Sequence, residues 1–147
     1  MKPSTSELLM VLVQDLSLRI APALEDTYLQ SSAQLWAVLS LLTNQEQARA
    51  ADARLKDIRS MQAMFGTLSD LAGPELKIRL RTAHAAEDHR LDIASLDAIH
   101  AELSTLLIAL QEELEMRESP DAREACKMIW RHLHASAERH ALSLPFS

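Results

Sequence analysis

The chain of 147 residues contains one cysteine and only two glycines. A single cysteine, Cys126, cannot form an internal disulfide, which favours a reducing compartment and a role for the thiol as a small buried hydrophobe. The sequence has no glycine-rich phosphate loop, no Gly-x-Ser-x-Gly and no Cys-x-x-Cys. We therefore expect neither nucleotide-dependent catalysis nor a cofactor.

Positive charge, aromatic side chains and long apolar runs are also scarce. Fifteen Lys and Arg against 21 Asp and Glu give a formal charge of −6, and only 3% of residues are aromatic. Such a chain repels a phosphate backbone and offers little base stacking, so nucleic acid is not an expected partner. The longest apolar run, 35–42, is far shorter than a bilayer crossing, and no secretory cleavage site follows the N-terminus. We expect no membrane association and a cytoplasmic location.

Apolar residues at helical spacing, by contrast, are abundant. One stripe between residues 96 and 114 consists of Leu96, Ile99, Leu103, Leu106, Leu110 and Leu114. Such a stripe lies on one face of a helix and must be buried against other helices. The sequence predicts an all-α fold, an antiparallel bundle of four or five long helices with one short extra helix, in a single domain over residues 1–147.

Capping and helix-breaking residues mark the helices of the first half. A capping box at Ser4 and Glu7 starts the first helix, and Pro22 should end or kink it. A cap at residues 43–44 is expected to divide 26–68 into two helices, and one continuous helix is the alternative. The side chains predicted to point inward from the first two helices are Leu8, Leu12, Leu16, Ile20, Tyr28, Leu35, Trp36, Leu39 and Leu42.

The second half has firmer boundaries. Gly-Pro at 73–74 starts a short helix at 75–86, although its alternating charged and apolar residues would also fit a strand. Asp92 or Ser95 caps a long helix, and Ser-Pro at 119–120 begins the last one. The predicted inward side chains of the last helix are Ala122, Cys126, Ile129, Trp130, Leu133 and Ala137.

Histidine and acidic residues are concentrated between positions 84 and 100. His84, Asp88, His89 and His100 could bind a metal or transfer a proton, and His84 and Asp88 share a helix face. The Glu-x-x-His pairs of ferritin-like dinuclear sites do not occur. We therefore favour solvated polar residues over a metal site. A second group has a composition that suits the negative end of a helix dipole, and it comprises His132, His134, Glu138 and His140.

The two tryptophans are the largest apolar side chains of the sequence. Trp36 and Trp130 both lie on predicted inward stripes, and Tyr28 lies on the same predicted stripe as Trp36. Core packing is the favoured interpretation. The alternative is that the three aromatic residues line an apolar pocket for an acyl chain or a flat aromatic ligand.

Three segments carry a resemblance to known proteins: residues 21–28, with the sequence Ala-Pro-Ala-Leu-Glu-Asp-Thr-Tyr, residues 91–115, and residues 129–131 with the helical segment after them. They resemble small all-helical bacterial proteins of unknown function, often encoded beside acyl-CoA dehydrogenases and aminoglycoside-phosphotransferase-like kinases. The resemblance brings no catalytic residues, and it implies an accessory role near acyl-CoA metabolism.

Apolar residues beyond the assigned stripes indicate more apolar surface than one small core needs; they are Leu18, Leu41, Leu107 and Ile108. With so few reactive clusters, the sequence predicts a non-catalytic module that binds another protein or itself, as a homodimer. The alternatives are a bundle that binds a small acyl or aromatic ligand and, less favoured, a metal-dependent enzyme built on His84, His89 and His100.

Overall fold

The computed structural model describes residues 3–87 and 92–143, and every regular element in these ranges is a helix. The predicted all-α fold of packed helices is confirmed. The chain divides into two compact units. We call Met1–Ala50 with Ala141–Ser147 the hairpin unit, and Ala51–His140 the bundle unit.

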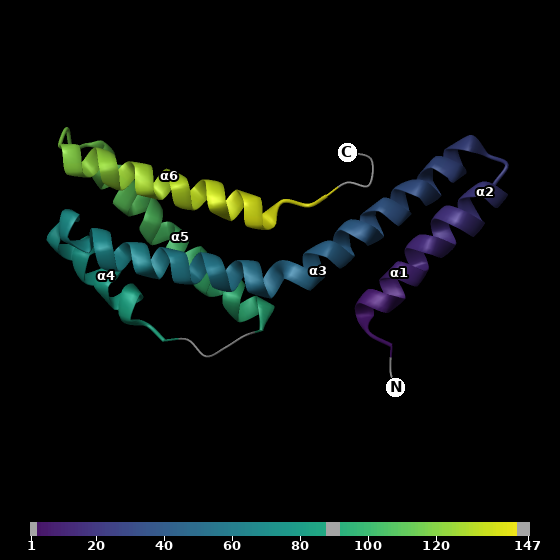
Figure 1. The fold of residues 1–147 in the computed structure, drawn as a ribbon, viewed down its shortest axis with the longest axis horizontal. Coiled ribbons are helices and arrows are strands. Elements are labelled where there is room, and N and C mark those ends of the chain that lie inside the picture. Colours follow the sequence, from purple (N-terminus) through teal and green to yellow (C-terminus); the bar gives the residue numbers. More distant parts are fainter. Residues whose placement is uncertain (1–2, 88–91, 144–147) are drawn as a thin grey trace. The chain divides into compact units, whose positions relative to one another are not determined.

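The hairpin unit begins with α1 (Thr5–Asp15), which continues through a π-helical segment, η1 (Leu16–Ile20), into the short α2 (Ala21–Ala23). The predicted capping box is present, because the Glu7 amide donates to the Ser4 hydroxyl and the Ser4 amide donates to the Glu7 carboxylate. The helical segment ends at Ala23, one residue after Pro22, and the predicted end at this proline is therefore confirmed. A three-residue connection then leads into α3 (Thr27–Leu68), whose first part runs back along α1 (Figure 1).

The cap predicted at residues 43–44 is wrong, and the alternative of one continuous helix holds. α3 contains 42 residues, from Thr27 to Leu68. The Thr43 hydroxyl donates to the Leu39 carbonyl 2.8 Å away, one turn back in the same helix, and so does not cap a new one. No proline occurs within α3, and its only glycine, Gly66, comes near the end, so nothing interrupts the backbone ladder.

The bundle unit combines the later part of α3 with η2 (Ser69–Leu71), α4 (Pro74–Ala85), α5 (Ile93–Glu115) and α6 (Pro120–His140) (Figure 1). The segment after residues 73–74 is helical, as predicted. Asp92 caps α5 by accepting from the Ser95 amide. The core contains all the predicted α5 leucines and the large side chains of the later part of α3, among them Ile58, Met61, Met64, Phe65 and Leu68.

Several predicted inward positions are wrong. α1 has no buried residue, and in the hairpin unit Leu8, Leu12, Ile20, Tyr28, Leu35, Trp36 and Leu39 are exposed. In α6 the buried residues are Ala122, Ala125, Ile129 and His132, whereas Trp130, Leu133 and Ala137 are exposed. The buried positions of α6 follow spacings of three, four and three, so a residue one position after Ile129 points about 100° away from the core.

By length and composition, α5 alone among the described helices is long and apolar enough to cross a membrane. The sequence prediction considered only unbroken apolar runs and so overlooked it. In the bundle unit α5 contributes six buried leucines to the core, and core helices often have such a composition.

Candidate functional site

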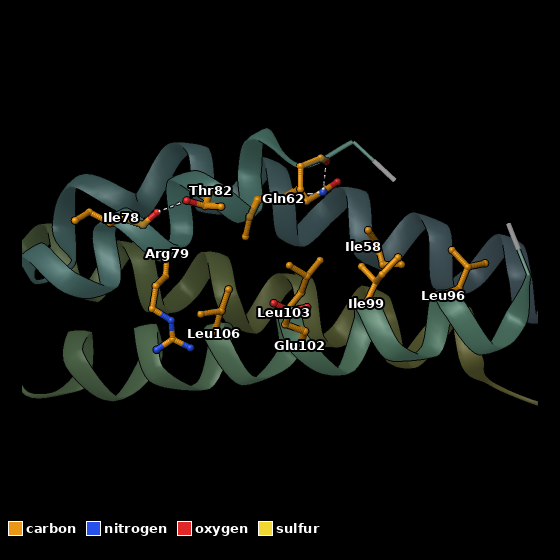
Figure 2. A pocket seen from close by; sticks show the side chains of 12 residues that line it. Ile58, Gln62, Ile78, Arg79, Thr82, Leu96, Ile99, Glu102, Leu103 and Leu106 are labelled. Carbon is orange, nitrogen blue, oxygen red and sulfur yellow. Dashed lines mark hydrogen bonds between the residues drawn. The ribbon is translucent and has the colours of Figure 1, made fainter. Parts of the chain in front are cut away.

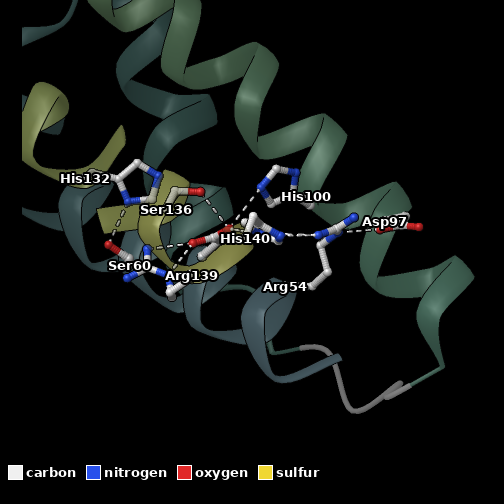
Figure 3. Close-up of polar contacts among 9 residues, drawn as sticks. Arg54, Ser60, Asp97, His100, His132, Ser136, Arg139 and His140 are labelled. Atoms are coloured by element: carbon white, nitrogen blue, oxygen red, sulfur yellow. Dashed lines mark hydrogen bonds and ion pairs between the residues drawn. The ribbon is translucent and has the colours of Figure 1, made fainter. Parts of the chain in front are cut away.

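The most specific polar arrangement of the bundle unit is built around Asp57, which lies on the buried face of α3. Asp57 occupies the position between Ala53 and Met61 in the apolar stripe and is 0% exposed. A buried carboxylate is costly unless charged or hydrogen-bonding partners compensate it. The residues around Asp57 come from α3, α5 and α6 (Figure 3). Together with Asp57 they form what we call the Asp57 cluster, which comprises Arg54, Asp57, Ser60, Asp97, His100, His132, Ser136, Arg139 and His140.

The last two turns of α6 supply the direct partners of Asp57. The Ser136 hydroxyl and His140 Nε2 donate to Oδ2 at 2.9 and 2.7 Å, and Arg139 Nε donates to Oδ1 at 2.7 Å. Arg139 Nη2 also lies 2.6 Å from Oδ1 as an ion pair, although it lacks hydrogen-bond geometry. His100 Nε2, from α5, is 3.7 Å from Oδ2. Both carboxylate oxygens of Asp57 are therefore occupied.

Arg54 forms a second layer that joins the three helices. Its Nη1 donates to His140 Nδ1 at 2.8 Å, and its Nε donates to Asp97 Oδ1 at 2.7 Å. Because His140 Nδ1 accepts from Arg54, the ring proton resides on Nε2, where it is donated to Asp57. An Asp–His pair acts as a general base only when the second ring nitrogen faces a nucleophile, and here that nitrogen is occupied.

Burial and charge shift the titration of this cluster. Burial would raise the pKa of Asp57, but the hydrogen bonds from His140, Arg139 and Ser136 together hold this pKa below its ordinary value. Burial lowers the pKa of His132, with the negative charge of Asp57 opposing it only partly. Burial likewise lowers the pKa of His100. The cluster thus holds an ionised carboxylate beside two histidines whose charged form is disfavoured.

These contacts give the Asp57 cluster a structural role. They fasten the C-terminal turns of α6 to α3 and α5, and they leave Asp57 no open position for a substrate. His132 is held in the same way, by a 2.8 Å hydrogen bond between its Nδ1 and the Ser60 hydroxyl. Within residues 3–87 and 92–143, no group of three or more His, Cys, Asp or Glu side chains could hold a metal ion.

The residues predicted as a metal site have different surroundings. His84 Nδ1 lies 2.8 Å from the Gln62 carbonyl and donates to it, and the ring covers Gly66. His100 belongs to the Asp57 cluster. Asp88 and His89 lie outside the described residues. Of the four predicted ligands, His84 and His100 are therefore described, and they contact different groups of α3: His84 the Gln62 carbonyl, and His100 the Asp57 carboxylate.

The aromatic residues predicted to line a pocket are all exposed. Tyr28 and Trp36 belong to the hairpin unit and are 77% and 63% exposed, and Trp130, in the bundle unit, is 62% exposed. The prediction that they point inward is wrong. Cys126 is partly buried, and burial raises the pKa of its thiol, with the charge of Glu115 adding to the effect. A thiol of raised pKa is a poor nucleophile at neutral pH.

A cavity of about 380 Å³ lies between α3, α4 and α5 of the bundle unit (Figure 2). Its walls are mainly aliphatic, and its volume is within the range of small-molecule sites. The lining residues are Ile58, Gln62, Ile78, Arg79, Thr82, Ala83, Ala86, Leu96, Ile99, Glu102, Leu103 and Leu106. None of the three aromatic residues predicted to form a pocket lines this cavity.

Sequence reasoning missed Asp57, although a signal for it was present. The apolar stripe of α3 runs through Ala53, Met61 and Phe65, and Asp57 is the one charged residue at this spacing. A charge on an inward stripe predicts a buried partner, and the basic end of α6 was the candidate to supply it. Comparison of the chain with known protein families, curated proteins and solved structures finds no match.

Proposed function

We propose that this chain is a non-catalytic helical module that pairs with a second copy of itself through the hairpin unit. The observation that carries the proposal is that the described residues of the hairpin unit include no large apolar side chain that is buried. Among its described residues, the buried ones are four alanines: Ala21, Ala33, Ala37 and Ala50. Two helices joined by a short connection do not form a stable structure on this little burial.

The apolar side chains of the hairpin unit face outward instead. Twelve of the described large apolar residues of this unit are exposed. One is Leu142, and the other eleven lie on the helices of the hairpin: Leu8, Met10, Val11, Leu12, Leu18, Ile20, Tyr28, Leu29, Leu35, Trp36 and Leu39. Scattered exposed leucines are ordinary on a protein surface, but a concentration on one short hairpin indicates a binding surface.

Charged residues are missing from the same stretches. Residues 8–14 of α1 and 27–45 of α3 contain no Asp, Glu, Lys, Arg or His. Interface cores are depleted of charge and enriched in aromatic side chains, and Tyr28 and Trp36 fit that pattern. Although the whole chain carries a net charge of −6, two copies could bring these uncharged faces together without direct repulsion.

A second hairpin unit is the simplest partner that covers these faces, because two helical hairpins pack into a four-helix bundle with two-fold symmetry. Complete burial of an apolar side chain contributes about 1.5–3 kcal/mol, so covering about half of these half-exposed side chains in each of the two copies contributes on the order of 10 kcal/mol. This is comparable with the roughly 4–15 kcal/mol that association costs in lost freedom. We therefore expect a reversible dimer.

The proposal that the module is non-catalytic is supported by the hydrogen bonds that Asp57 and His140 already make and by the raised pKa of the Cys126 thiol. Both oxygens of Asp57 and both nitrogens of His140 are engaged in hydrogen bonds within the bundle unit. Burial raises the pKa of the Cys126 thiol, which keeps it protonated at neutral pH.

Sedimentation velocity of the full chain between about 1 and 100 μM tests the self-association directly. The proposal expects the average mass to rise from monomer to dimer with concentration. Two variants with one tryptophan each locate the contact. In Trp130→Phe, the remaining Trp36 should shift its emission to shorter wavelength as the dimer forms, whereas the emission of Trp36→Phe should stay unchanged.

Matched substitutions provide the control, because Trp36 and Trp130 are almost equally exposed. Trp36→Glu should weaken the dimer at least ~30-fold, as expected for a charge placed at an interface anchor. Trp130→Glu should leave it unchanged. A strict monomer at all concentrations would overturn the proposal, and so would a dimer that Trp130→Glu disrupts and Trp36→Glu does not.

A further inference from the structure

The cavity of the bundle unit is elongated and has walls of branched aliphatic side chains. Figure 2 shows Ile78 and Arg79 at one end and Leu96 at the other. The lining residues of α5 extend from Leu96 to Leu106, which corresponds to about 15 Å along the helix axis. None of the lining residues that the structure describes is aromatic. This shape fits a flexible hydrocarbon chain better than a flat ring system.

The polar groups of the cavity lie among these aliphatic side chains. The Gln62 amide nitrogen is already used, because it donates to the carbonyls of Ala83 and Ala86 at the end of α4. The Thr82 hydroxyl donates to the Ile78 carbonyl. Neither group therefore has a hydrogen left to donate to a ligand.

Arg79 is different, because it forms no hydrogen bond or ion pair with the described residues. Among the described residues, it is the one cationic side chain that lines the cavity. Its guanidinium presents five donors in a planar fork that matches a carboxylate, and it is less strongly hydrated than an ammonium group. Glu102 also lines the cavity without a described partner, so its charge would oppose an anionic ligand.

We propose that this cavity binds a medium-chain fatty acid, with the carboxylate on Arg79 and the hydrocarbon chain along α5 toward Leu96. The chain replaces water against Ile58, Ile99 and Leu103, which supplies the affinity. The guanidinium fixes the direction of the ligand and selects the acid over a neutral or basic chain of equal length.

Isothermal titration calorimetry of the full chain with octanoate and decanoate, below their micelle concentrations, tests this site. Each added methylene should tighten binding about fourfold, so decanoate should bind about 15-fold tighter than octanoate. Decanol and decylamine should bind at least about tenfold more weakly than decanoate, because neither forms a bidentate ion pair with Arg79.

Charge variants separate Arg79 from a general effect of surface charge. Arg79→Gln should weaken decanoate binding at least about tenfold, whereas Arg123→Gln, an exposed arginine of α6 that does not line the cavity, should leave it unchanged. Glu102→Gln should tighten the binding of decanoate by removing a like charge. The same Glu102→Gln change should weaken any binding of decylamine.

Methyl NMR of isoleucine locates the ligand independently of affinity. Decanoate should shift the δ1-methyl signals of Ile58, Ile78 and Ile99, which line the cavity, and leave those of Ile108 and Ile129 unchanged. Absence of decanoate binding at millimolar concentration would overturn the proposal. It would also be overturned by equal affinity for decanol, or by shifts confined to Ile108 and Ile129.

Discussion

Substitution of Asp57 by asparagine should destabilise the bundle unit far more than any exposed acidic residue does. Asparagine has the size of aspartate and can still accept from the Ser136 hydroxyl, so the change removes charge and little volume. It leaves Arg139 and the remaining cluster without their central anion. The perturbation therefore tests whether the buried carboxylate, and not packing alone, holds α6 on α3.

The magnitude follows from the exposure of the partners. Removing one member of a fully buried ion pair costs about 3–5 kcal/mol. The side chains of Arg139 and His140 are 26% and 27% exposed, so water compensates part of the loss. We expect a loss of about 2–4 kcal/mol in the free energy of unfolding for Asp57→Asn, which is large against a typical domain stability of about 5–15 kcal/mol.

Urea denaturation followed by circular dichroism at pH 7 measures this loss. The matched control is Asp52→Asn on the same helix, whose exposed ion pair with Lys56 should contribute at most about 0.5 kcal/mol. The pKa of Asp57 is lower in the folded protein than in the unfolded chain, where it is about 3.9. The contribution of Asp57 to the free energy of unfolding is therefore fully present well above pH 3.9, and it is lost as the pH falls from about that value through the folded pKa. Equal stability of Asp57→Asn and Asp52→Asn at pH 7 would refute the reasoning.

Three further outcomes are expected. Burial lowers the pKa of His132 in the folded protein, so below about pH 6.5 the unfolded chain binds more protons than the folded one. The free energy of unfolding should therefore fall between about pH 6.5 and 5, and it should fall less steeply in His132→Gln. Urea titrations at several pH values would measure this difference. A Cβ on Gly66 would come 2.7 Å from the His84 ring. Gly66→Ala should therefore stabilise the protein, by the about 0.5–1 kcal/mol that alanine gains in helix propensity, only when His84 is also replaced by alanine. A double-mutant cycle measures this coupling, and equal effects of Gly66→Ala with and without His84→Ala would contradict the prediction. Leu110→Ala should cost about 2–5 kcal/mol and its exposed neighbour Ile108→Ala less than about 0.5 kcal/mol, and comparable losses in thermal melts would contradict the burial pattern.

The helices of the bundle unit could be predicted well from the sequence, because the apolar stripes and the capping residues indicate the same helix boundaries. The leucines of α5 recur at one face and Asp92 caps its start, so local preference and core packing point to the same structure. The continuous α3 was harder to predict. Thr43 suits both a cap and a helix interior, and only the absence of a helix-breaking residue decides between them.

Burial in the hairpin unit could not be read from periodicity, because a stripe tells which residues share a face and not whether a partner covers it. The stripe through Leu35 and Leu39 is as regular as that of α5, yet these leucines are exposed while Ala33 and Ala37 are buried. In α6 a small error in the assigned helix phase placed Trp130 inside and left His132 outside. Asp57 was missed because its partners are remote in sequence.

That remoteness has a consequence for the order of events in folding. The hydrogen bonds to Asp57 join residues 79, 82 and 83 positions apart, so Ser136, Arg139 and His140 are synthesised long after Asp57. During synthesis the carboxylate stays solvated until α6 exists, and closing so long a loop is slow. We expect these contacts to form only after the apolar core has assembled, so loss of the Asp57 carboxylate should accelerate unfolding while leaving the refolding rate nearly unchanged.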